Sequence, residues 1–186
     1  MLRRCYCPKT LEKQPTYKDY DVCEEWKSFM SFRAWMMAQE EAGNDWEGRY
    51  LSMRVLVKGS KVYSPETCIF VPVEINNLFT DHAAARGKYK QGVYWHEING
   101  KFHAQMNKYG KSKSIGFYET EDEAHGAYLT AKGNYVKEIA NALTVPYDLD
   151  RLRPALLVRA EHLLAYAQHL QKLSLIDGQT ALLRRR

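Results

Sequence analysis

The segment from residue 92 to 117 constrains the fold of this chain more than any other part of it. It holds an Asn99-Gly100 pair, and both residues tolerate the positive φ that a tight hairpin turn needs. From residue 102 to 107, apolar and polar side chains alternate, which is typical of a strand with one buried face. A second turn at residues 109–111 would bring the chain back. The segment therefore predicts a three-stranded antiparallel sheet.

A helix is expected directly after this sheet. Thr120 and Glu123 have the spacing of a capping box, in which each side chain bonds the backbone amide of the other residue. Small and aromatic residues then recur at helical spacing at Ala124, Ala127, Tyr128, Ala131 and Tyr135. Small side chains on this stripe let the helix approach the sheet closely. Trp95, Phe102 and Phe117 are predicted to fill the space between them.

The same segment is strongly basic. Residues 86 to 117 include seven basic side chains and one acidic side chain, whereas the whole chain has a formal net charge of +5. A basic sheet face that is almost free of acid favours contact with nucleic acid. By strand phase Lys113 falls on the helix side, so it is left out of the predicted contacts. The residues predicted to contact DNA are Arg86, Lys88, Lys90, Tyr94, His96, His103, Gln105, Asn107, Lys108, Lys111, Ser112 and Ser114.

Four strings in this unit follow the order of a known domain. They are Gly92-Val93-Tyr94-Trp95, Gly100-Lys101-Phe102-x-Ala104-Gln105, the run Ile115-Gly116-Phe117-Tyr118-Glu119-Thr120, and Glu123-Ala124 with Ala127-Tyr128. The unit thus resembles the APETALA/ethylene-response-factor DNA-binding domain, whose sheet enters the major groove of double-stranded DNA. Several positions that carry arginine or tryptophan in the plant proteins hold tyrosine, histidine, asparagine or serine here. We therefore expect modest affinity without strong bidentate arginine readout.

The N-terminal part has a different pattern. Aromatic and methionine residues predict a helix over about 26–40, with these side chains in a core. Residues 51–57 alternate as a short strand, 69–72 form a second strand, and 74–79 a short helix. The predicted order is helix, strand, loop, strand, short helix.

This order comes with a second set of strings. They are Arg4-Cys5-Tyr6-x-Pro8-Lys9, Tyr17, Val22-Cys23-Glu24-Glu25-Trp26, Tyr63-Ser64-Pro65-Glu66-Thr67-Cys68, Val71-Pro72 and Glu74-Ile75-Asn76. They look like the HNH-type homing endonucleases of tailed bacteriophages, which often carry the same sheet domain downstream. In that family a ββα unit holds one divalent ion and a histidine activates water. The resemblance implies a phage protein in the cytoplasm of an infected bacterial host cell.

The catalytic groups of that family are missing from their expected places. No histidine precedes His82, and Ser52 and Arg54 stand where the phage relatives carry acids. The oxygen ligands that remain are Glu66, Glu74, Asn76 and Asn77. Such a carboxylate-poor set binds a hard cation weakly. We therefore assign no catalytic residue and no metal ligand, and Mg²⁺ is expected only if the chain is an active nuclease.

The cysteines and the apolar runs bear on the compartment. The four cysteines do not have paired zinc-ligand spacing, so reduced thiols are expected instead of a zinc site or disulfides. No apolar run approaches membrane length, and MLRRCYCPK has no hydrophobic signal core. A cytoplasmic protein without a membrane partner is expected.

A C-terminal helix is predicted to begin near Asp150, with Pro154 confined to its first turn. Its wide apolar stripe would be buried against the sheet domain or against a second copy. The stripe comprises Leu152, Leu156, Leu157, Leu163, Leu164, Tyr166, Ala167, Leu170 and Leu173. The helix could therefore mediate a homodimer or bind a host protein. The final three arginines, 184–186, are expected either to add nonspecific attraction for phosphates or to be disordered.

The sequence predicts an α+β protein with four parts. Residues 1–80 form a degenerate HNH-like ββα module, 81–91 a basic linker, 92–143 the sheet domain and 147–186 a helical extension. The predicted function is double-stranded DNA binding by a phage protein whose nuclease centre is lost. Two alternatives stay open: an active divalent-metal-dependent nicking endonuclease, and a phage factor that binds and inhibits a host protein.

Overall fold

The computed structural model describes residues 1–80, 87–146 and 148–183, with side chains up to residue 176. The predicted DNA contact Arg86 and the three final arginines lie outside the described residues. The protein is 53% helical and 18% strand, so the α+β class is confirmed. The chain divides into two compact units, one of residues 1–80 with 143–155, the other of residues 81–142 with 156–186.

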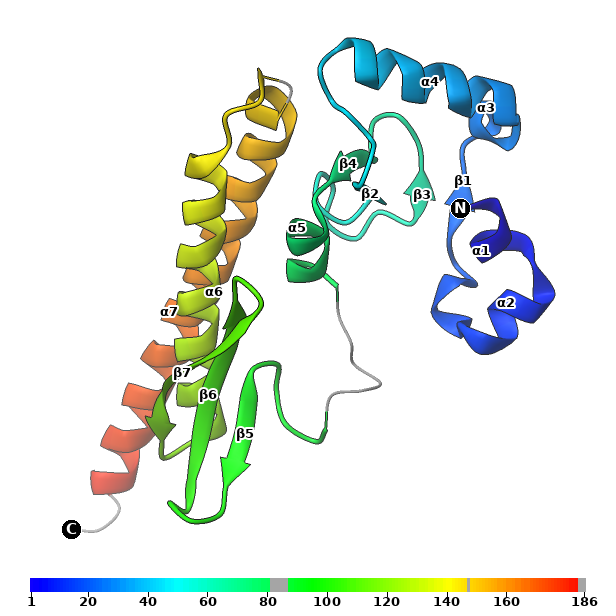
Figure 1. Ribbon diagram of the computed structural model, residues 1–186. Coiled ribbons are helices and arrows are strands. Elements are labelled where there is room, and N and C mark those ends of the chain that lie inside the picture. The colour runs from blue at the N-terminus through cyan, green and yellow to red at the C-terminus, as the bar shows by residue number, and fades with distance from the viewer. Residues whose placement is uncertain (81–86, 147, 184–186) are drawn as a thin grey trace. The chain divides into compact units, whose positions relative to one another are not determined.

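The N-terminal unit is built from short elements (Figure 1). Its helices are α1 Leu2–Tyr6, α2 Pro8–Lys13, α3 Glu24–Lys27, α4 Phe29–Glu41 and α5 Val73–Leu78, with a 3₁₀ turn at Pro15–Tyr17 and a π-helical turn at Asp148–Leu152. Its strands are β1 Asp21–Val22, β2 Tyr50–Ser52, β3 Val62–Tyr63 and β4 Ile69–Val71. Strand β1 pairs with β3 in parallel, and β2 pairs with β4 antiparallel.

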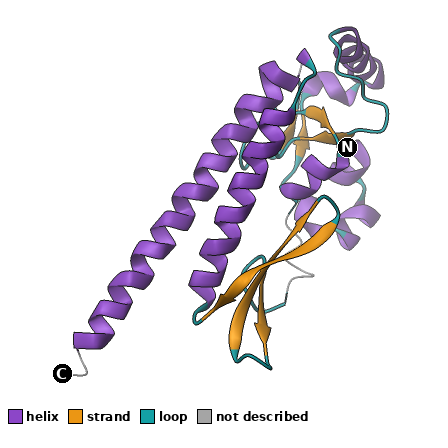
Figure 2. Cartoon of the chain, turned by 60° about the vertical axis from the view of Figure 1, so that its left-hand side comes forward, coloured by secondary structure: helices purple, strands orange, loops and turns teal. Residues whose placement is uncertain are grey.

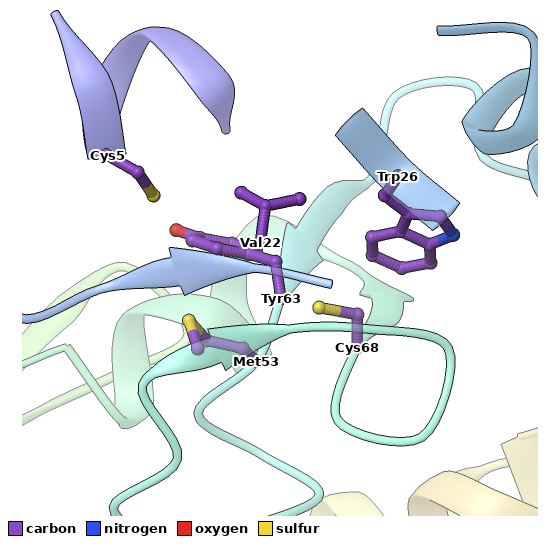
Figure 3. Packing of buried hydrophobic residues seen from close by; sticks show 6 residues of the cluster. All are labelled: Cys5, Val22, Trp26, Met53, Tyr63 and Cys68. Carbon is purple, nitrogen blue, oxygen red and sulfur yellow. The ribbon is translucent and has the colours of Figure 1, made fainter. Parts of the chain in front are cut away.

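Buried side chains from distant parts of the sequence form the core of this unit. Figure 3 shows Cys5, Val22, Trp26, Met53, Tyr63 and Cys68 packed together. The indole of Trp26 contacts the ring of Trp35, with centroids 4.6 Å apart, and Trp35 reaches Phe70 at 5.5 Å. Aromatic packing thus joins α3 and α4 to β4, which is buried along its whole length.

Two predictions for this unit are wrong in detail. The helix expected over 26–40 is interrupted at Ser28, which is extended and caps α4 by accepting from the Ser31 amide. On α4, Phe29 and Met30 are not core residues, since 68% and 64% of their surfaces are exposed. The strand expected over 51–57 ends at Ser52. In the antiparallel pair Ser52 lies opposite Ile69, the first residue of β4, so β4 provides no strand partner beyond Ser52 and residues 53–57 form turns and bends instead.

The second unit contains the predicted sheet. Its elements are β5 Val93–His96, β6 Lys101–Lys108, β7 Lys111–Tyr118, α6 Glu121–Ala142 and α7 Arg153–Leu183, whose first residues belong to the other unit. The strands are antiparallel in the order β5-β6-β7, and α6 packs on one face (Figure 1). The predicted capping box is confirmed: Thr120 Oγ1 accepts from the Glu123 amide at 3.2 Å, and Glu123 Oε2 from the Thr120 amide at 3.3 Å.

The two hairpin turns differ from the expectation. The tight turn with two positive φ values lies at Tyr109 (φ 53°) and Gly110 (φ 72°). The Asn99-Gly100 pair belongs to a four-residue loop in which the Gly100 amide bonds the Glu97 carbonyl at 3.2 Å. Only Gly100 has a positive φ in that loop. The prediction of a two-residue turn at Asn99-Gly100 is therefore wrong, although a hairpin does form there.

Helix α7 runs alongside α6 (Figures 1 and 2). The two helices approach closely at Gly133, where an added Cβ would lie 2.8 Å from Leu164 Cγ. Leu156, Ala160, Ala167 and Leu170 of α7 are buried. The apolar stripe thus packs on the sheet unit, while Tyr166 and Leu173 stay exposed. Pro154 lies in the first turn of α7, as predicted, and a π-helical turn occupies the place of the expected start at Asp150.

Within the described residues, no helix is both long enough and apolar enough to cross a bilayer.

Candidate nucleic-acid interface

Apart from Lys108 and Lys111, which pair with each other and by alternation fall on the side of α6, the predicted contact residues of the three strands lie on the face of the sheet opposite α6. Tyr94 pairs with His103, and Gln105 and Asn107 pair with Ser114 and Ser112. Side chains of paired residues lie on the same face. We call this surface the outer face. It comprises Tyr94, His96, Lys101, His103, Gln105, Asn107, Ser112, Ser114 and Phe117, each of which is exposed or half-buried.

Phe117 is the residue on this face that the sequence interpretation placed wrongly. A β-bulge shifts the register: Ala104 pairs with Gly116 and Gln105 with Ser114, which leaves Ile115 as the extra residue. Beyond the bulge the side chains change faces, so Phe117 lies opposite His103 and is 43% exposed. The glycine at 116 was the available signal, since a glycine inside a strand often marks a bulge.

Three rings gather at one end of the outer face. The imidazole of His103 stacks on Phe117 with centroids 4.6 Å apart, and His96 meets Phe117 edge-on at 5.1 Å. Ser114 Oγ lies 2.8 Å from His103 Nε2, and the Gln105 side-chain amide donates to Ser112 Oγ. The face therefore offers flat ring surfaces next to hydrogen-bonding groups that already have defined orientations.

No acidic residue occurs in β5, β6 or β7. Glu97 lies in the loop between β5 and β6, and Glu119 follows β7. An anion that approaches the outer face therefore meets no carboxylate on the strands themselves.

Half of the six described lysines of the basic segment are ion-paired. Lys90 binds Asp122, Lys101 binds Glu119 at 2.7 Å, and Lys108 binds Glu138. The hydrogen bond from Lys108 lowers the pKa of the Glu138 carboxyl, with a further contribution from Tyr109. Exposed ion pairs of this kind contribute little to stability, because water and salt screen the two charges. A phosphate can therefore replace the carboxylate at little cost in stability. In the absence of DNA, however, these three lysines attract anions less strongly than the excess of basic over acidic residues in the segment suggests.

The other three lysines have different surroundings. Lys88 Nζ lies 4.9 Å above the ring of Tyr89. Lys111 is exposed next to the tight hairpin turn. Lys113 is the strand partner of the buried Met106, so it lies on the helix side of the sheet, as the alternation along the strand predicted. Its side chain is exposed.

Contacts to α6 hold both ends of the sheet. At the hairpin tip, the Tyr109 amide donates to the Tyr135 hydroxyl at 3.2 Å, and the Tyr109 hydroxyl donates to Glu138 at 2.6 Å. Before β5, the Lys90 amide donates to Glu121 Oε1 at 2.6 Å. Hydrogen bonds to α6 therefore position the sheet at the hairpin tip and just before β5.

The N-terminal unit contains an antiparallel strand pair followed by a short helix, β2-β4-α5. Ser52, where an acid was expected from the resemblance, is buried, and its hydroxyl has no hydrogen-bond partner among the described residues. Glu66 and Glu74 are both exposed, and a hydrogen bond from Ser64 lowers the pKa of Glu66.

These donors do not fit a resident divalent ion. Among the described residues, no three histidine, cysteine, aspartate or glutamate side chains group as metal ligands. The four cysteines are free thiols, and burial raises the pKa of Cys68 to about 11.

The chain was compared with protein-family models, curated proteins and solved structures, and none matched.

Proposed function

We propose that this protein binds double-stranded DNA through the outer face of the β5-β6-β7 sheet, which docks in the major groove. The observation that carries the proposal is the composition of that face: three strands present rings, amides and hydroxyls side by side, and none of them carries an acid. The major groove, about 12 Å wide, admits such a ribbon.

The residues divide into two roles under this proposal. The amides of Gln105 and Asn107 are suited to the donor and acceptor pair of adenine, which is read in the major groove. Lys88 and Lys111 contact phosphates and set the position of the sheet without reading sequence. Because no described arginine lies on the outer face, guanine readout by a bidentate arginine is not part of the proposal.

We further propose that the chain descends from phage HNH-type nucleases and has lost their reaction centre. The β2-β4-α5 order supports this origin. The burial of Ser52 supports the loss, because a hydroxyl inside the unit cannot replace a carboxylate that contacts substrate.

A gel shift with duplex DNA at rising salt tests the DNA-binding proposal. The test variant combines Lys88→Ala, His103→Ala and Lys111→Ala. We expect a loss of affinity of about tenfold or more, together with a shallower dependence of binding on salt, because two phosphate contacts are removed.

The matched control combines Lys18→Ala, Lys58→Ala and His162→Ala. It removes the same residue types from exposed positions that are not in the outer face. Equal losses in the two variants would mean that binding follows net charge alone and that the outer face is not the site.

A metal-dependent nicking activity is the second candidate, and the β2-β4-α5 order is the observation that favours it. Supercoiled plasmid is incubated with the protein and Mg²⁺ or Mn²⁺. We expect no nicking. Nicking that disappears in Glu66→Gln or Glu74→Gln would overturn the proposed loss of the centre.

A further inference from the structure

The N-terminal unit contains a hollow of about 920 Å³ that is separate from the outer face. Helices α1 and α2 line it on one side, and residues of β2 and β3 complete it. Five basic side chains line the hollow against a single acid, Glu12. They are Arg3, Arg4, Lys9, Lys13 and Arg49.

Most of these cations are available to a ligand. Arg3, Lys9 and Lys13 are exposed and form no ion pair with any residue that the structure describes. Arg4 lies 5.8 Å from the centre of the Tyr17 ring, where its charge is not neutralised. The hollow therefore concentrates uncompensated positive charge from two helices that follow each other in the sequence.

Arg49 is the basic lining residue that already has an ionic partner among the described residues. Its guanidinium is largely buried and donates to Asp148 at 3.2 Å and to Asn44 Oδ1 at 3.1 Å. Tyr63 is buried in the lining, where it accepts a hydrogen bond from Arg4, and burial raises the pKa of its phenol to about 12. Its phenol thus stays neutral at physiological pH and adds no negative charge that would repel an anion.

We propose that this hollow binds the phosphate of a nucleotide, either a free nucleotide or one nucleotide unit of a nucleic-acid strand. Its volume is in the range of about 300–1,000 Å³ that small-molecule pockets have. Arginine forks and lysines are the donors that phosphate prefers. Tyr50, which is 52% exposed, and Leu51 provide the less polar wall on which a base can rest.

The test uses the full chain with two probes, ATP in EDTA and a fluorescent single-stranded decamer. Binding is measured by calorimetry for ATP and by anisotropy for the decamer, in about 0.1 M salt so that long-range attraction is screened. The test variant is Arg3→Glu with Lys13→Glu, two exposed positions whose side chains make no ion pair among the described residues. The matched control is Lys18→Glu with Lys58→Glu, which has the same net charge and the same unit but lies outside the hollow.

We expect at least tenfold weaker binding of one or both probes in the test variant and less than threefold in the control. Binding of ATP alone assigns a free nucleotide, and binding of the decamer alone assigns a strand. Equal losses in both variants, or no binding of either probe to the unchanged protein, overturn the proposal.

Circular dichroism checks that each variant is folded. If the glutamate variant is not, Arg3→Gln with Lys13→Gln is compared with Lys18→Gln and Lys58→Gln under the same criteria. The proposed nucleotide site is independent of the outer face. The variant that combines Lys88→Ala, His103→Ala and Lys111→Ala should therefore leave ATP binding unchanged. Either proposal can then be overturned without affecting the other.

Discussion

His103 and Phe117 stack face to face across β6 and β7, with ring centroids 4.6 Å apart and planes inclined by 17°. The pair exists because the bulge at Ile115 brings Phe117 to the outer face. A histidine held flat against a ring has a fixed orientation, and its Nε2 already lies 2.8 Å from Ser114 Oγ. Under the proposed function, Phe117 therefore orients His103 for DNA.

Phe117→Leu should weaken DNA binding by about two- to tenfold, which corresponds to the ~0.5–1.5 kcal/mol that an aromatic pair contributes. Leucine keeps an apolar side chain but offers His103 no flat surface. Fluorescence anisotropy with a labelled duplex measures the change. Phe29→Leu makes the same substitution at an exposed site of the other unit and should leave affinity unchanged. Equal effects from both variants would contradict the role of the stacked pair.

Glu138→Gln should strengthen DNA binding by a few fold. Glu138 holds both Lys108 and the Tyr109 hydroxyl, and the neutral amide releases the charge of Lys108 to contact a phosphate. One further phosphate contact makes the salt dependence of log K steeper by about 1. Anisotropy titrations at several salt concentrations give both quantities.

Glu161→Gln is the control for that experiment, because it removes one exposed negative charge from α7. If Glu161→Gln strengthens binding as much as Glu138→Gln, the gain comes from net charge and not from the release of Lys108.

The features that the sequence predicted correctly are local. The capping box at Thr120 and Glu123 needs only a spacing of three residues, and the alternation in β6 reports one buried face. The position of Phe117 could not be predicted in this way, because a bulge adds one residue and breaks the period of two. The register shift appears only in the pairing of Ala104 with Gly116 and of Gln105 with Ser114, which the alternation along one strand does not determine.

The charge distribution shows the same limit. The number of basic residues can be read from the sequence, but not which of them are ion-paired. Lys108 and Glu138 are thirty residues apart, and only the packing of α6 on the sheet brings them together. The basic hollow joins α1 and α2 to β2, more than thirty residues later. Contacts at such separations are decided by tertiary structure, so a pattern along the chain does not reveal them.

Gly92→Ala should destabilise the sheet unit by about 2–4 kcal/mol, since it combines overpacking with a left-handed backbone. Gly92 has φ +79°, and an added Cβ would lie 2.1 Å from Tyr128 Cδ2, inside the ring that covers it. Hydrogen exchange of the sheet amides measures the loss. Gly110→Ala is the control: φ is +72° but nothing lies within 4 Å, so only about 1–2 kcal/mol is expected. Equal losses of stability in Gly92→Ala and Gly110→Ala would show that the Tyr128 ring moves away from the added methyl group without a penalty.

The stability of the sheet unit should fall between pH 7.5 and 5.5 in a way that depends on His125. Burial lowers the pKa of His125, and its Nδ1 donates to the Gln91 carbonyl at 3.0 Å, which partly opposes that shift. In the unfolded chain the imidazole takes up a proton near pH 6.5, while the folded protein resists it. The contribution of the neutral His125 side chain to the free energy of unfolding is therefore complete above about pH 6.5. It is lost as the pH falls towards the lowered pKa of His125 in the folded protein.

His125→Gln removes the titrating group and should flatten the pH dependence, even though it lowers stability at every pH by loss of packing. The measurement is the hydrogen-exchange stability of the sheet amides at pH 7.5 and 5.5 for both proteins. His162→Gln, at an exposed position of α7, controls for the loss of a histidine as such. Because the prediction concerns the difference between two pH values, a general destabilisation cancels. An unchanged pH slope in His125→Gln would show that other groups produce it.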